Sequence, residues 1–100
     1  MEHKLIDAPD LSRFELRDGD ELLGWLDYRP AGASVILAHT EVAEGHEGEG
    51  LGGSIVRASL EELGAQGKTA IPTCPFAAAY LHRHPELAGH IDPSFRAQFA

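Results

Sequence analysis

The sequence predicts a mixed α/β fold: an antiparallel N-terminal meander, then a βαβ unit and a C-terminal helix. Three apolar segments separated by turn residues fill positions 12–42. A glycine-rich turn then leads into a helical pattern at 51–64. A short apolar segment at 69–73 precedes a second helix that starts at Pro75.

The meander is predicted from alternating hydrophobicity and from turn residues. Segment 12–17 alternates, and segment 21–28 has the apolar residues of a half-buried strand. Asp18-Gly19-Asp20 is typical of the turn between them. A second turn at 29–32 contains proline and glycine. It leads to 34–42, whose apolar run suits a central strand.

The second half of the chain predicts a crossover. The pattern at 51–64 places its apolar residues on one helical face, and Gly64 is the first stop signal. A strand that follows a crossover helix runs parallel to the strand before it. Segments 34–42 and 69–73 should therefore be parallel neighbours, with Pro72 removing one backbone donor from the second. The tail after residue 90 gives little signal.

Composition indicates one small domain over residues 1–100. The chain is 43% hydrophobic and has a formal net charge of −8, with no block of Lys or Arg. Binding to nucleic acid or to an anionic membrane is therefore not expected.

A single cysteine excludes an intrachain disulfide and favours a reducing compartment. The first residues lack the apolar run of a signal peptide, and no stretch is long enough to span a membrane, so a cytoplasmic location is expected. The oligomeric state stays open.

The turn at 44–53 has the composition of an anion-binding loop. It holds five glycines in ten residues and opens a helix. Glycine allows close backbone approach, and free N–H groups of a first helical turn favour phosphate. A flexible surface loop is the alternative. The sequence has neither the Lys-Ser/Thr of a Walker loop after Gly53 nor an acid placed as in a Rossmann fingerprint. No His or Cys set has the spacing of a metal site.

Three segments together resemble one family. Residues 47–52 resemble the acyl-CoA pyrophosphate loop of the GNAT acetyltransferase superfamily, Q/R-x-x-G-x-G/A. Two more segments, His39-Thr40-Glu41-Val42 and Ile71 to Phe76 followed by Tyr80-Leu81-x-x-His84-Pro85, resemble its compact single-domain branch. The resemblance covers about residues 10–90. It implies a minimal acetyl-CoA-binding fold with N-acetyltransferase activity toward an amine that the sequence does not identify.

The resemblance also implies the residues that would bind CoA. Glu47 stands where the family usually has Arg or Gln, and Glu44 and Glu49 are nearby. These three carboxylates should repel a pyrophosphate, so weak CoA affinity or a changed ligand is expected. The backbone N–H of Val42 is the implied contact to the thioester region. The remaining implied cofactor contacts are Gly48, Glu49, Gly50, Leu51, Gly52, Gly53 and Ser54.

Four residues are candidates for catalysis. Cys74 precedes a proline-started helix, where a thiolate can be favoured, and the compact branch has a Cys there; burial as an inert core residue is the alternative. Tyr80 is implied to protonate the leaving thiolate, or it packs its ring on the core. His39 and Glu41 share one strand face and either could accept a proton from an amine, or they are polar surface residues.

The sequence therefore favours a GNAT-type acetyl-CoA-dependent N-acetyltransferase with a small-molecule acyl-CoA as partner. Two other functions stay open: a CoA-binding or acyl-CoA-binding module without turnover, and a partner-binding domain that kept only the fold.

Overall fold

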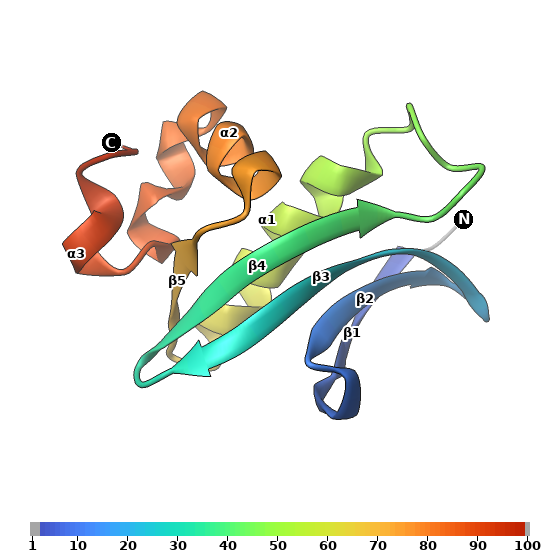
Figure 1. Ribbon diagram of the computed structural model, residues 1–100, viewed down its shortest axis with the longest axis horizontal. Coiled ribbons are helices and arrows are strands. Elements are labelled where there is room, and N and C mark those ends of the chain that lie inside the picture. The colour runs from blue at the N-terminus through green and yellow to red at the C-terminus, as the bar shows by residue number, and fades with distance from the viewer. Residues whose placement is uncertain (1–2, 100) are drawn as a thin grey trace.

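The computed structural model of the chain describes residues 3–99, so the predicted domain limits at 1 and 100 lie outside it. A five-stranded sheet is covered by helices, of which α1 lies between β4 and β5 in the chain (Figure 1). The strands are β1 (His3–Ala8), β2 (Arg13–Asp18), β3 (Glu21–Ala31), β4 (Ser34–Val42) and β5 (Thr69–Pro72). The α-helices are α1 (Leu51–Ala65), α2 (Pro75–Arg83) and α3 (Pro93–Arg96), and the 3-10 helices are η1 (Pro9–Leu11) and η2 (Pro85–His90).

The sheet has the order β1-β2-β3-β4-β5. The first four strands pair antiparallel and β5 pairs parallel to β4, as predicted. The mixed α/β class, the meander and the βαβ unit are therefore confirmed. One strand was missed: β1 precedes the predicted meander, pairing with β2 from His3↔Asp18 to Ala8↔Arg13. It is an edge strand with mostly exposed side chains, so its sequence has no apolar pattern from which a strand could be predicted.

The core lies between the sheet and α1, which runs behind β3 and β4 in Figure 1. The helix presents one apolar face because its large aliphatic residues recur at helical spacing. Burying such side chains contributes about 1.5–3 kcal/mol each. The fully buried large side chains are Phe14, Leu23, Leu26, Leu37, Ile55, Val56, Leu60, Leu81 and Ile91.

The C-terminal segment, for which the sequence gave little signal, is tied to the free edge of β5. Ile91 forms a bridge with Ala70, and the Asp92 N–H donates to the Ala70 carbonyl over 2.8 Å. The Asp92 carboxylate caps α3 by accepting from the Ser94 N–H, and it also accepts from the Ser34 hydroxyl. The pKa of Asp92 is lowered, first by the Ser34 bond and then by Ser94. In Figure 1, α2 and the segments that follow it lie together beyond β5.

A β-bulge changes which face of the sheet the end of β4 presents. Asp27 pairs with His39 and Tyr28 with Leu37, so Ala38 is an extra residue on β4. Side chains of a regular strand alternate, so His39 would otherwise share the buried face of Leu37. Because of the bulge, Thr40 points to the helix side, while His39 and Glu41 are exposed on the other face.

The face of the sheet opposite α1 carries charged residues that pair with one another. Glu15 is only 5% exposed, yet it is charge-compensated because Arg13 and Arg17 donate to it over 2.8 and 2.9 Å. Burial raises the pKa of Glu15, but the hydrogen bonds from Arg17 and Arg13 outweigh it, and the pKa lies below its usual value. Arg13 also stacks over Trp25, which pairs with Glu41 on β4.

Among residues 3–99, no helix combines the length and the apolar character that crossing a bilayer requires.

Candidate active site

A gap opens in the sheet where β4 continues beyond the end of β5. The ladder between them ends at Leu37↔Pro72, where the missing proline N–H removes no needed bond. The Leu37 carbonyl then accepts from the Thr73 hydroxyl and from the Cys74 N–H, over 3.1 and 2.9 Å. The chain leaves the sheet there and enters α2, so the remainder of β4 has no paired strand on this side within the described residues.

Backbone groups of β4 face this gap. The Ala43 N–H donates to the Leu23 carbonyl of β3 over 2.8 Å. Backbone N–H groups alternate in direction along a strand, so the Val42 N–H points to the opposite edge, toward the gap. A donor in this place agrees with the thioester contact that the family resemblance implies for Val42.

The glycine-rich loop ends at the N-terminus of α1, close to the end of β4. Gly50 is the N-cap with φ of 75°, no side chain caps the helix, and its first turn holds no acidic residue. The first N–H groups of a helix have no partner within it. Gly45, Gly48 and Gly50 all have positive φ, and a Cβ on any of them would meet nothing within 4 Å. The loop therefore offers open backbone and free donors, which fit a pyrophosphate.

Two carboxylates of the loop are held by other groups. Glu47, in the position where the family has Arg or Gln, accepts from the Gly45 N–H over 3.0 Å. Glu49 Oε1 lies 3.3 Å from His46 Nδ1. Both side chains belong to the carboxylates expected to repel CoA, and each has a contact inside the loop.

Gly52 and Gly53 have a packing role that the sequence analysis did not predict. A Cβ on Gly52 would lie 2.6 Å from Phe76 Cζ, and one on Gly53 would lie 2.6 Å from Tyr80 Cε1. These two aromatic rings, one helical turn apart on α2, therefore rest directly on the first turn of α1. Both glycines are explained by this close helix contact, whether or not they also bind phosphate.

Tyr80 is held by a polar network between α1 and η2. Its hydroxyl accepts from Arg57 Nε over 3.2 Å, and Arg57 also donates to Glu86 over 3.2 Å. The bond to Tyr80, and then the one to Glu86, raises the pKa of Arg57 above its already high value, so it stays charged. The ring of His84 stacks on Tyr80 with centroids 4.2 Å apart. Arginine has no acceptor atom, so the Tyr80 proton stays available to another group.

Cys74 is the N-cap of α2, and Pro75 is its first residue, as the sequence predicted. Its side chain is only 2% exposed and belongs to the core cluster. The thiol Sγ lies 3.5 Å from Thr40 Oγ1, across the helix side of the gap. This burial favours the packing role that the sequence analysis kept open for Cys74.

Alkylation of Cys74 by a small reagent is expected to be roughly 10²-fold slower in the folded protein than in the unfolded chain, because reaction requires local opening. Mass spectrometry after timed incubation with iodoacetamide, with and without urea, measures the rates. Cys74 is the only cysteine, so Cys74→Ala gives the unlabelled control. Fast labelling of the folded protein that CoA suppresses would contradict the packing role and favour a nucleophile.

His39 and Glu41, which were predicted to share one strand face, contact each other. His39 Nε2 lies 2.8 Å from Glu41 Oε1, and the two side chains are 57% and 48% exposed. The bulge at Ala38 places this pair on the face of the sheet away from Cys74 and Thr40. The four catalytic candidates are therefore not one cluster: the pair lies on one side of β4, and Cys74 and Tyr80 belong to the helix side.

Four residues near the site were not predicted. They are Thr40, His46, Arg57 and Phe76, which contact Cys74, Glu49, Tyr80 and Gly52 respectively. Arg57 lies one helical turn after Gly53 on α1, so the helical spacing could have placed it beside Tyr80 once that contact was known. Thr40 depends on the bulge, His46 on loop geometry, and Phe76 on the packing of α2 against α1.

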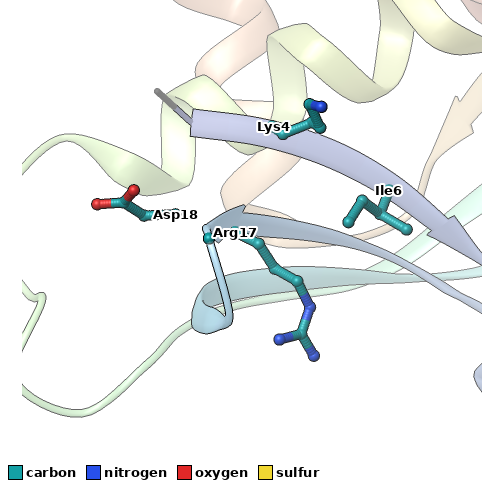
Figure 2. Close-up of a pocket in the computed structure, with 5 residues that line it drawn as sticks. Lys4, Ile6, Arg17 and Asp18 are labelled. Atoms are coloured by element: carbon teal, nitrogen blue, oxygen red, sulfur yellow. The ribbon is translucent and has the colours of Figure 1, made fainter. Parts of the chain in front are cut away.

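A cavity of about 310 Å³ lies away from the loop, between β1, the end of β2 and the turn that leads to β3. It is lined by Lys4, Ile6, Arg17, Asp18 and Gly19. Figure 2 shows the Asp18 carboxylate pointing away from the Arg17 guanidinium, which instead pairs with Glu15. None of the predicted site residues lines it. Within residues 3–99, no group of three or more His, Cys, Asp or Glu side chains is arranged to hold a metal ion.

The gap between β4 and β5 lies beside α1, a helix that starts after Gly50 and has no side-chain cap. Residues 13–90 match the family described as GCN5-related N-acetyl-transferase. The chain therefore belongs to the GCN5-related N-acetyltransferase family and is a GNAT-type enzyme, as the sequence resemblance implied.

Comparison with solved structures supports the same fold. The chain is similar to the NMR solution structure of a GCN5-like protein from Staphylococcus aureus, named as a candidate N-acetyltransferase. The two chains are 20% identical, with a TM-score of 0.67, over 89% of this chain and 87% of the other. At this identity the likeness shows the fold alone. No curated protein matches this chain in sequence.

Proposed function

We propose that this protein binds acetyl-CoA along the loop 45–53 and the gap between β4 and β5, and transfers its acetyl group to an amine. The observation that carries the proposal is the gap itself, with the Val42 N–H facing it and the free helix terminus of α1 beside it. The family generally uses acetyl-CoA, and the open backbone at Gly45, Gly48 and Gly50 suits its pyrophosphate. Bound acetyl-CoA would supply an activated acetyl group as a thioester.

The two sides of β4 suit two different proton transfers. Glu41 holds His39 through Nε2, which leaves Nδ1 free on the open face, where an amine can approach. His39 would take the amine proton as the nitrogen bonds to the acetyl carbon. Tyr80, from the helix side, would give its proton to the sulfur as the carbon–sulfur bond breaks. A direct transfer of this kind needs no acetyl group on Cys74, in agreement with the burial of that thiol.

Calorimetry with CoA and acetyl-CoA tests the proposal, followed by mass spectrometry of a panel of amines incubated with acetyl-CoA and protein. Binding with acetylation of an amine is the expected result. The exposed position of His39 and Glu41 also suits a CoA-binding module without turnover, since no base from β4 lies beside Tyr80. Binding without acetylation of any amine would favour that module, and no binding would overturn both.

Replacing Glu47 by Arg is expected to tighten CoA binding by about 0.5–1.5 kcal/mol, because an exposed acid is exchanged for a cation beside a pyrophosphate. Titration calorimetry at low and high salt measures the change, and the gain should shrink as salt screens it. Glu61→Arg, an exposed charge reversal late in α1, is the matched control and should change affinity less. Equal affinity of Glu47→Arg and the parent at low salt would mean that this side chain does not face CoA.

A further inference from the structure

The ring of His46 lies between two carboxylates from different parts of the chain. Its Nε2 is 2.7 Å from Glu21 Oε2, at the start of β3, and its Nδ1 is 3.3 Å from Glu49 Oε1, in the loop. A neutral imidazole donates from one nitrogen only, whereas an imidazolium donates from both. Both partners are acceptors when ionised, so this arrangement needs the protonated ring.

The two contacts of His46 join the sheet to the loop directly before the N-terminus of α1, where an anion would bind. Glu21 is the first residue of β3, and Glu49 directly precedes Gly50, the N-cap of α1. The His46 N–H also donates to the Ala43 carbonyl over 3.0 Å, which fixes the backbone of this residue. The charged groups that contact the ring are Glu21 from β3 and Glu49 from the loop. Glu47 is bonded instead to the Gly45 N–H.

We propose that protonated His46 is a positioning residue that holds Glu49 away from the N-terminus of α1, so that CoA binding depends on its protonation. When the ring loses a proton, one of its two carboxylate contacts is lost. The Nδ1 contact is the longer of the two, so Glu49 is released first. A free carboxylate beside a helix N-terminus is attracted to the same N–H groups that a pyrophosphate would use. Released Glu49 therefore competes with CoA and repels it. This inference rests on the proposed function.

The direction of the His46 pKa agrees with this geometry. Hydrogen bonding to Glu21, and then to Glu49, raises the pKa of His46 above 6.5. A raised folded-state pKa means that the ring is charged below 6.5 and loses its proton as pH rises through the higher value. CoA affinity should therefore be greatest on the acid side of that pKa and fall above it.

The experiment is titration calorimetry of the full chain with CoA at low salt, at about pH 6 and about pH 8.5, which bracket an ordinary or raised histidine pKa. The parent is expected to bind roughly three- to tenfold more weakly at the higher pH, the scale of a partly exposed charge interaction. Titration in buffers of different ionisation enthalpy should show net proton uptake between these values. NMR of the imidazole in the free protein follows His46 without any ligand.

Three variants separate this effect from the titration of CoA itself. His46→Gln cannot carry the charge and should bind weakly at both pH values. Glu49→Gln removes the competing carboxylate and should bind tightly at both. His90→Gln, whose ring packs on Gly64 near the other end of α1, is the control and should keep the pH dependence of the parent.

Each outcome either supports or overturns the role proposed for His46. A pH dependence that both His46→Gln and Glu49→Gln abolish supports the inference. CoA affinity that is equal at both pH values, or that changes equally in parent and both variants, overturns the inference and leaves the proposed function standing. No CoA binding by the parent at either pH overturns the proposed function, and the inference with it.

Discussion

Replacing Tyr80 by Phe is expected to lower kcat for acetyl transfer by about 10²-fold, the lower end of the range for general acid catalysis. The change removes only the hydroxyl oxygen, which accepts from Arg57 over 3.2 Å and whose proton is free for the departing sulfur. The phenyl ring can still rest on Gly53, so α1 and α2 should stay packed. KM for acetyl-CoA should change little, because the loop is untouched.

Steady-state kinetics measures this effect, with thermal unfolding of the same variant as a check on its fold. The chain has two tyrosines, which provides a matched control. Tyr28 bonds to Asp7, and burial together with this bond raises its pKa to about 12. It belongs to β3 and packs against Phe14, so Tyr28→Phe should leave kcat unchanged. A Tyr80→Phe enzyme with the kcat of the parent would show that another group protonates the leaving sulfur.

Replacing Gly24 by Ala is expected to lower the free energy of unfolding by about 2–3 kcal/mol, in the range for overpacking a core. Gly24 lies in β3, where a Cβ would be 2.6 Å from the Glu41 carbonyl oxygen and 2.6 Å from Ile55 Cδ1. The first contact is with backbone of the paired strand, which cannot move without breaking the ladder. Strand β4 would be displaced near Val42, so CoA binding should weaken as well.

Urea denaturation at equilibrium measures the loss, and Gly89→Ala is the matched control. A Cβ on Gly89 meets nothing within 4 Å, and its φ is not in the left-handed region, so that change should be within about 0.5 kcal/mol of the parent. If Gly24→Ala is as stable as Gly89→Ala, then β3, β4 and α1 can separate more easily than their contacts indicate.

Much of the fold could be predicted because the spacing of apolar residues changes from a strand pattern before residue 42 to a helical pattern after residue 51. Strand β4 has the predicted limits of 34–42, and α1 extends the predicted 51–64 by one residue. Both elements are central, so burial dictates their patterns. Strand β1 was missed because only Leu5 and Ala8 are half-buried in it. The segment after residue 90 was not predicted because a backbone hydrogen bond to Ala70 holds it in place. Such a contact leaves no local pattern in the sequence.

The candidate site was harder to predict, because its geometry depends on contacts distant in sequence. The family resemblance placed Tyr80 and the glycine-rich loop, and the structure brings them together through Gly53. The resemblance could not show that the bulge at Ala38 places His39 on the face of the sheet opposite Cys74. The partners that hold Glu47 and Glu49 were also hidden, since a hydrogen bond inside a loop has no periodic signature. The expected repulsion of CoA by these carboxylates stays a prediction.

The contacts of Gly52 with Phe76 and of Gly53 with Tyr80 bear on how this sequence can diverge. Each ring occupies the space that a side chain at the facing glycine would need, so a larger residue at one position requires a smaller one at the other. A side chain at 53 would require a smaller residue at 80, and the same holds for 52 and 76. Among homologues these positions should covary as two pairs, with small residues on α1 accompanying aromatic ones on α2. Inheritance of the loop that meets the cofactor is in this way linked to inheritance of the residue proposed to donate the proton.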